Sequence, residues 1–290
     1  MTRLRLISAL LLLSAIASIV YIRVIHGRDN DTIAPVISMD QTEISISVED
    51  DENALLEGVT AKDNRDGDVT DSLTVDNIST FNSEGKRYVT IAAFDANNNV
   101  GKATREISYT DYRPPHFDIT EPMVFSIGAT RFFDNITAND VLDGDVTGNI
   151  HFQDNTRFLT SDAGEYNVVL QVTNSAGDVA SLPLTISIID KAYDDKPQVH
   201  LKHYVRYTKK NIPLDYANLM DYVYIGSRRF ELVDGNEVED TTIGRNKIRI
   251  NDDGVTYDKP GIYTVNYKLT VEQGEEKVTG TTKLIVVVED

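Results

Sequence analysis

The chain has 290 residues and a formal net charge of −18, from 46 acidic and 28 basic residues. This acidity argues against nucleic-acid binding, which needs a positively charged surface. There is no cysteine, which excludes disulfides, thiol catalysis and cysteine-based zinc sites, so each domain must fold by apolar burial alone.

The charge is unevenly distributed along the chain. Residues 1–28 have a net charge of +4, residues 29–191 of −19 and residues 192–290 of −3. The acidity therefore lies in the middle of the chain. The nearly balanced last third is better suited to approach an anionic polymer.

The first feature in chain order is an uncharged apolar segment, Leu6 to Ile22, behind a short basic start. As a helix it would span about 25 Å, near the lower limit for crossing a bilayer. We therefore predict a single-pass transmembrane signal anchor within residues 1–28, with the C-terminal region extracellular. Ala15 and Ala17 also fit a signal-peptidase site, so a cleaved signal peptide is the alternative. Both interpretations export residues 29–290.

Beyond residue 28, apolar and polar residues alternate. The clearest stretches are Thr42–Glu49, Tyr88–Phe94, Tyr166–Val172 and Tyr263–Val271. A period of two is typical of strands that turn one face to a core. Many short strands separated by turn residues predict an all-β fold of antiparallel β-sandwiches.

Two segments of the chain are copies of each other. The pentapeptide Asp-Gly-Asp-Val-Thr occurs at Asp66–Thr70 and again at Asp143–Thr147. Each copy opens with proline after a short polar link, and a longer, divergent third segment opens at Pro197. The spacing predicts three tandem immunoglobulin-like domains, at residues 29–111, 112–191 and 192–290.

The order of these motifs resembles bacterial immunoglobulin-like surface repeats, which occur in tandem in Gram-positive envelope proteins and in some crystal toxins. The resemblance rests on the motif Ala-Pro-Val-Ile at residue 34, the Asp-Gly-Asp-Val-Thr turn, the Gly-to-Tyr strand starts and Asp95–Val100. It covers residues 32–191 well and residues 192–290 more loosely. It implies a non-enzymatic extracellular module for spacing, display or adhesion.

A tyrosine begins a late strand in each repeat: Tyr88, Tyr166 and Tyr263. In immunoglobulin-like sandwiches such a tyrosine donates a hydrogen bond from its hydroxyl to upstream backbone, the tyrosine corner. We predict this structural role for all three residues.

The repeated pentapeptide has two interpretations. The favoured one is a copied turn, because glycine adopts positive φ freely and aspartate bonds nearby backbone N–H groups. The other is a calcium site, because Ca²⁺ prefers six to eight oxygen ligands and several carboxylates repel one another without a cation. The candidate ligands are Asp63, Asp66 and Asp68 in the first copy, and Asp140, Asp143 and Asp145 in the second.

The third segment interleaves tyrosines with basic residues. The favoured interpretation is an amphipathic strand with Tyr204 turned inward. The alternative is a ligand-binding face, because tyrosine and arginine form contact hot spots and tyrosine rings stack on sugars. The candidate face comprises Tyr204, Arg206, Tyr207, Tyr222, Tyr224, Arg228 and Arg229.

None of the motifs GxSxG, HExxH, GxxxxGK and GxGxxG is present. His200 and His203 would face opposite sides of a strand, so we expect no zinc site there. We predict a non-enzymatic, membrane-anchored extracellular protein that acts as a spacer or an adhesion and display module. The alternatives are a calcium-dependent carbohydrate- or protein-binding module, or an accessory subunit of a cell-envelope assembly. Expected partners are an envelope protein or wall polysaccharide, and the membrane.

Overall fold

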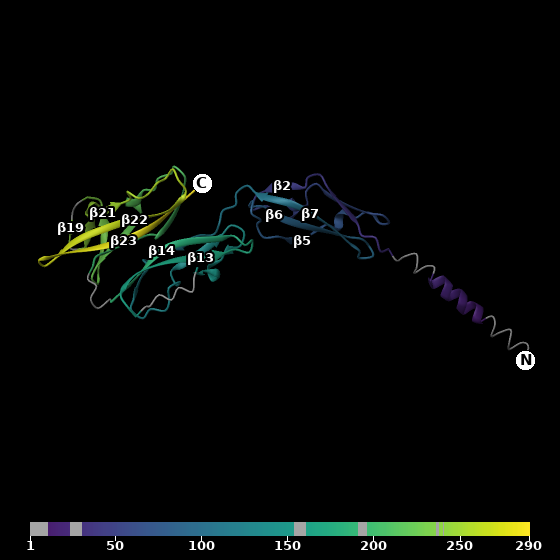
Figure 1. Cartoon of the computed structure of the whole chain (residues 1–290), viewed down its shortest axis with the longest axis horizontal. Helices are drawn as coiled ribbons and strands as arrows, with labels where there is room; N and C mark the ends of the chain where they lie inside the picture. The colour runs from purple at the N-terminus through teal and green to yellow at the C-terminus, as the bar shows by residue number, and fades with distance from the viewer. Residues whose placement is uncertain (1–10, 24–30, 154–160, 191–195, 236–237, 240) are drawn as a thin grey trace, which may run out of the picture. The chain divides into compact units, whose positions relative to one another are not determined.

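The computed structural model describes residues 11–23, 31–153, 161–190, 196–235, 238–239 and 241–290. Its first part is a helix over residues 11–23, shown in purple in Figure 1. The predicted anchor Leu6 to Ile22 thus lies partly outside the described residues. Within the described part of the chain, we find no helix with both the length and the apolarity needed to cross a membrane.

The chain divides into two compact units, Met1–Tyr112 and Arg113–Asp290. The division falls within one residue of the predicted boundary between the first and second domains. The predicted boundary at residue 191 does not separate compact units, and residues 191–195 are outside the described residues. The division into three domains stays a prediction.

The first unit contains two sheets that pack face to face. One has the order β1-β3-β4 and the other β2-β7-β6-β5. Neighbouring strands run antiparallel except for β2 and β7, which are parallel. The core between the sheets contains Val59, Val89, Ile91 and Ile107. The elements are β1 (Val36–Met39), β2 (Glu43–Ile46), α2 (Glu52–Leu56), β3 (Val59–Asp63), β4 (Gly67–Asp68), η1 (Thr70–Ser72), β5 (Thr74–Ile78), β6 (Arg87–Phe94) and β7 (Val100–Tyr109).

The second unit begins with a sheet pair of closely similar order. Its sheets are β11-β10-β8 and β12-β13-β14-β9, in which β9 and β14 are parallel. The repeat seen in the sequence is therefore a repeat of strand order and register. The elements are β8 (His116–Ile119), β9 (Val124–Ser126), β10 (Ile136–Asp140), β11 (Gly144–Asp145), η2 (Thr147–Asn149), β12 (His151–Phe152), β13 (Gly164–Thr173) and β14 (Val179–Ile189).

A third sheet pair completes the second unit. Its sheets have the orders β15-β17-β18-β20-β19 and β16-β23-β22-β21, and the long hairpin β22–β23 is the yellow element of Figure 1. The elements are β15 (Gln198–Leu201), β16 (Val205–Lys209), η3 (Tyr216–Leu219), β17 (Met220–Ile225), β18 (Arg228–Val233), β19 (Val238–Glu239), β20 (Thr242–Gly244), η4 (Arg245–Lys247), β21 (Ile248–Asn251), β22 (Gly261–Gln273) and β23 (Glu276–Glu289).

The second and third sheet pairs are joined through their backbones and a shared core. The Tyr204 N–H donates to the carbonyl of Ile119 at 2.8 Å, and the Ile285 N–H donates to the carbonyl of Tyr204 at 2.9 Å. Buried apolar residues from both pairs form one continuous cluster. This joint explains why residues 113–290 behave as one compact unit.

Candidate cation cluster and binding groove

Asp63 and Asp140 end equivalent strands, β3 and β10, and both are buried. Oδ1 of Asp63 accepts hydrogen bonds from the N–H groups of Arg65 and Asp66 at 2.8 and 2.9 Å. These bonds hold the pKa of the Asp63 carboxyl below its ordinary value, since they favour the charged form. Gly67 has a φ of 81°, which explains the glycine of the motif.

The other four aspartates of the two turns bond to different parts of the backbone. Oδ1 of Asp68 accepts from the N–H of Thr70 at 3.0 Å, and Asp145 makes the same bond to Thr147 at 2.9 Å. Oδ2 of Asp66 accepts from the N–H of Ala96 at 2.8 Å, and Asp143 accepts from the N–H and hydroxyl of Ser175. These bonds fit the copied-turn interpretation.

A cluster of three carboxylates does form in the first unit, from Asp31, Asp63 and Asp95. One carboxylate oxygen from each residue lies within 4.8 Å of the other two. Asp31 is 9% exposed and Asp63 2% exposed, and Oδ2 of both is buried without a hydrogen-bond partner among the described residues. Only Asp63 was among the ligands predicted from the sequence. Asp31 and Asp95 were missed because each lies 32 residues from Asp63 in the sequence.

In the second copy, the buried carboxylate equivalent to Asp63 has a hydrogen-bond partner for its second oxygen. Asn174 lies where the first copy has Asp95, and its Nδ2 donates to Oδ2 of Asp140 at 3.1 Å. Its own Oδ1 accepts from the N–H of Asp178 at 2.9 Å, as Oδ1 of Asp95 does from Asn99 at 2.7 Å. An amide thus satisfies the buried carboxylate that stays unsatisfied in the first copy.

Two of the three predicted corner tyrosines, Tyr166 and Tyr263, make the expected bond to upstream backbone. The hydroxyl of Tyr166 donates to the carbonyl of Asp162 at 3.0 Å, and that of Tyr263 to the carbonyl of Lys259 at 2.8 Å. In the first repeat the strand register puts Arg87 at the position of Tyr166. Nε of Arg87 donates to the carbonyl of Ser79 at 2.6 Å, while Tyr88 is exposed. A cation therefore makes the upstream bond in the first repeat.

Two tyrosines of the predicted ligand face lie in the joint. Tyr204 is only 4% exposed, and burial raises the pKa of its hydroxyl. The Tyr207 oxygen accepts from the N–H of Phe117 at 2.9 Å, and its ring stacks on His116 with centroids 3.7 Å apart. Burial raises the pKa of Tyr207 to about 12. The Tyr207 side chain thus contacts the second sheet pair directly, whereas Tyr204 reaches it through its backbone N–H.

The remaining members of that face form other contacts. Tyr222 and Tyr224 pack edge to face beside His200, and the Arg229 guanidinium lies 3.9 Å from the Tyr222 ring centroid. The guanidinium of Arg228 lies 5.3 Å from the Phe230 ring. Nε of Arg206 is buried without a hydrogen-bond partner among the described residues. Arg206 and Tyr207 lie on β16 of one sheet, whereas Tyr222, Tyr224, Arg228 and Arg229 lie on β17 and β18 of the other. A ligand-binding role for these residues stays a prediction.

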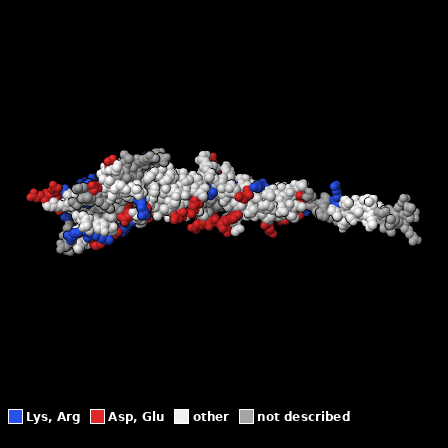
Figure 2. Space-filling view, turned by 90° about the horizontal axis from the view of Figure 1, so that it is seen from below, with Lys and Arg blue, Asp and Glu red and all other residues white. Residues whose placement is uncertain are grey.

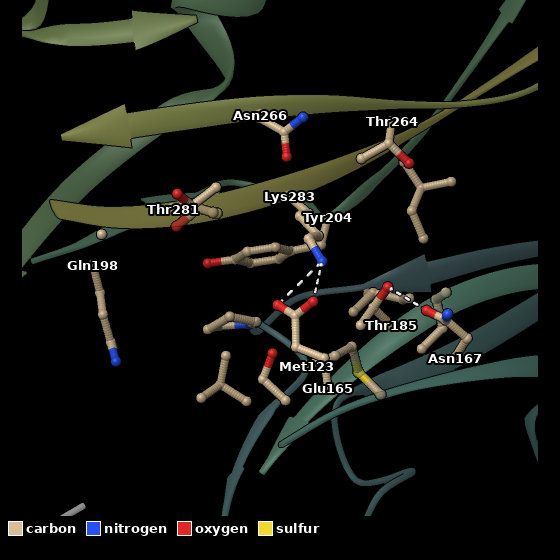
Figure 3. Close-up of a pocket in the computed structure, with 18 of the residues that line it drawn as sticks. Met123, Glu165, Asn167, Thr185, Gln198, Tyr204, Thr264, Asn266, Thr281 and Lys283 are labelled. Atoms are coloured by element: carbon tan, nitrogen blue, oxygen red, sulfur yellow. Dashed lines mark hydrogen bonds and ion pairs between the residues drawn. The ribbon is translucent and has the colours of Figure 1, made fainter. Parts of the chain in front are cut away.

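A cavity of about 930 Å³ lies between the second and third sheet pairs. Residues of β13, β14, β22 and β23 line it. On β22 they alternate, because side chains of one parity point away from the sandwich core. Figure 3 shows Thr264 and Asn266 on one wall opposite Asn167 and Thr185 on the other. Nζ of Lys283 bridges the cavity to Glu165 at 3.2 Å. We call this cavity the interpair groove.

Three histidines of the described residues lie at the joint, each beside a carboxylate of the other sheet pair. Nε2 of His116 lies 2.6 Å from Glu289, Nδ1 of His203 lies 2.7 Å from Asp118, and Nδ1 of His200 lies 3.7 Å from Glu121. Burial holds the pKa of His116 below its ordinary value, and the Glu289 carboxylate opposes this shift. Burial also lowers the pKa of His200. No sequence pattern predicts that these three histidines lie together, because their carboxylate partners are distant in the sequence.

We expect the stability of residues 113–290 to fall as the pH drops from 7 to 5. Unfolded histidine binds a proton near pH 6.5, whereas His116 and His200 in the fold bind it only at lower pH. The unfolded state therefore holds more protons in this window, which costs at most about 1.4 kcal/mol per pH unit for each histidine. Thermal unfolding at several pH values measures the slope. His116→Gln should reduce it, while the exposed His151→Gln should not; equal slopes would refute the assignment.

No family model matches the chain. An uncharacterized 81.3 kDa protein of Acholeplasma phage L2 is 29% identical over 90 residues, which are 31% of this chain and 11% of that protein. The matched stretch is thus about a tenth of the relative's length. The specific surface-repeat family stays an expectation.

Solved structures with similar chains include a carbohydrate-binding module in complex with GlcNAc, with neighbouring domains, from ZmpB of Clostridium perfringens. It is 16% identical, with 51% of this chain and 26% of that chain covered and a TM-score of 0.20. The extracellular domain of protocadherin γB4 is 13% identical, with 88% of this chain and 49% of that chain covered and a TM-score of 0.20. At these scores the likenesses carry no argument about function.

Proposed function

We propose that the protein is a non-catalytic extracellular binding module, held at the cell membrane by its N-terminal segment, and that its ligand is a polysaccharide of the cell envelope. The interpair groove is the observation that carries this proposal. Its volume of about 930 Å³ is large enough to hold a short run of sugar units.

The chemistry of the groove suits a polar polymer. Threonine hydroxyls and asparagine amides line both walls, and such groups both donate and accept hydrogen bonds. The lining contains three lysines and one glutamate in a protein of net charge −18. This local excess of positive charge favours a ligand with some anionic groups over a cationic one.

The helix at residues 11–23 supports the membrane part of the proposal. Its leucine, isoleucine and valine side chains are exposed, among them Leu11, Ile16 and Ile19. In Figure 2 the helix forms an almost entirely white, uncharged surface. Exposed apolar surface of this kind is costly in water and is removed from it by a lipid phase.

We expect a bulky residue in the groove to block binding of wall polysaccharide. Thr264 and Thr270 lie on the same face of β22 and are both exposed, but only Thr264 lines the groove. Thr264→Trp should therefore weaken retention of the full-length protein on immobilised wall polysaccharide at least tenfold, while Thr270→Trp should not. Retention measured by surface plasmon resonance gives both values.

Two outcomes would count against the groove. If both tryptophan variants bind as well as the unaltered protein, the polymer binds elsewhere. If the unaltered protein binds no polysaccharide, adhesion to an envelope protein or a spacer role becomes the better account, and co-purification from detergent distinguishes a partner protein from a spacer.

A further inference from the structure

The geometry points to one calcium ion bound between Asp31, Asp63 and Asp95 in the first unit. This site is independent of the interpair groove and of the polysaccharide proposal. It differs from the sequence-based expectation in its ligands, since Asp66 and Asp68 are bonded to backbone elsewhere. It also differs in number, since only the first copy provides it.

The spacing of the carboxylates fits calcium. Ca²⁺ binds oxygen at about 2.3–2.6 Å, so two ligand oxygens on opposite sides of the ion lie about 5 Å apart. Oxygens from the three aspartates are all within 4.8 Å of one another. One ion can therefore contact all three, with water completing the six to eight ligands that calcium takes.

The hydrogen bonds around the cluster leave one oxygen each of Asp31 and Asp63 available, while Oδ2 of Asp95 accepts from Nδ2 of Asn99 at 2.6 Å. Oδ1 of Asp31 accepts from the N–H of Ile33 at 3.0 Å, and Oδ1 of Asp63 accepts from two N–H groups. Oδ2 of both residues is buried and has no hydrogen-bond partner among the described residues. A buried carboxylate oxygen without a partner is costly, and a cation removes that cost.

The backbone of two turns holds one oxygen of Asp63 and one oxygen of Asp95. Oδ1 of Asp63 accepts from the N–H groups of Arg65 and Asp66, at 2.8 and 2.9 Å. Oδ1 of Asp95 accepts from the N–H groups of Asn97 and Asn99, at 2.9 and 2.7 Å. These bonds fix the orientation of both carboxylates, so they need little rearrangement to bind an ion.

The second copy shows what the same turn does without a third carboxylate. Asn174 replaces Asp95 there and donates to Asp140. Asp111, which precedes β8 as Asp31 precedes β1, instead accepts from the hydroxyl of Ser47 and the N–H of Val48, at 2.6 and 2.8 Å. Neither condition for the ion is met, so we expect a stoichiometry of one.

The ion would hold the chain before β1 against the ends of β3 and β6. Asp31 precedes β1, Asp63 ends β3, and Asp95 follows β6, so the three ligands come from both sheets and from the entering chain. Calcium would therefore stabilise the point at which the chain leaves the N-terminal segment and enters the first sandwich.

The test is calcium titration of the full-length protein in detergent after removal of metals with chelator. Calorimetry should give one site, with a Kd on the order of 10⁻⁴ M or tighter. Millimolar calcium should raise the melting temperature of the first unit by roughly 5–10 °C, and magnesium should do so much less. No heat of binding together with identical melts would overturn the proposal.

Asp95→Asn is the decisive variant, because it converts the cluster into the arrangement that already exists at Asn174. It should lose calcium binding at least tenfold while its melt in chelator stays equal to or above that of the unaltered protein. Asp68→Asn and Asp145→Asn are matched controls and should keep the single site. Loss of binding in either control, with Asp95→Asn unaffected, would return the site to the repeated pentapeptide and refute the cluster.

Discussion

Replacing Tyr204 by alanine should lower the free energy of unfolding of residues 113–290 by about 3–5 kcal/mol, as for other fully buried aromatic side chains. Tyr204 is 4% exposed and lies in the joint between the second and third sheet pairs. Its oxygen accepts the N–H of Leu201 at 3.2 Å. The truncation therefore leaves both a cavity and an unpaired buried N–H group. Urea unfolding of the full-length protein measures the loss.

Two further variants separate the joint from a ligand face. Tyr204→Phe removes only the hydroxyl and should cost about 1 kcal/mol. Tyr222→Ala, in the same predicted face but half-buried, should cost clearly less than Tyr204→Ala. If Tyr204→Ala unfolds at the same urea concentration as the unaltered protein, the joint does not hold the two sheet pairs together.

Local patterns in the sequence were enough to predict several strands and the repeated turn. Alternation of polar and apolar residues follows from the geometry of a single strand, and so it marks Tyr263–Val271 as part of β22 without knowledge of its neighbours. The Asp-Gly-Asp turn is equally local, since Asp63 bonds within three residues of itself. Both features repeat because their causes lie within a few residues.

The joint and the carboxylate cluster depend on contacts between distant segments. Alternation indicated that Tyr204 turns inward, but its partner Ile119 belongs to the previous sheet pair. In the same way Asp31, Asp63 and Asp95 come together only when β1, β3 and β6 are packed. A pattern search favours residues that are close in sequence, which is why it selected Asp66 and Asp68.

Arg105 is a cation buried in the core of the first unit, and we expect its replacement to be strongly destabilising. It is 2% exposed, and burial lowers its pKa. Its Nη1 donates to the carbonyls of Leu55 and Glu57 at 3.0 and 2.9 Å, and its Nη2 donates to that of Gln41 at 2.8 Å. The guanidinium therefore ties the end of α2 and the β1–β2 connection to β7. A planar group with several fixed donors suits this task, and lysine does not.

Arg105→Leu should lower the free energy of unfolding of the first unit by about 2–4 kcal/mol, since three carbonyl oxygens lose their donor. Leucine is the matched choice, because the strand register places Leu184 at this position in the second repeat. Arg105→Lys should recover only part of the loss. Lys102, on the same strand, pairs with Asp76 at the surface, and Lys102→Ala should cost less than about 1 kcal/mol. Chemical unfolding of the four proteins decides the matter. An Arg105→Leu variant as stable as the unaltered protein would mean that the hydrogen bonds of the guanidinium only offset the cost of removing its charge from water.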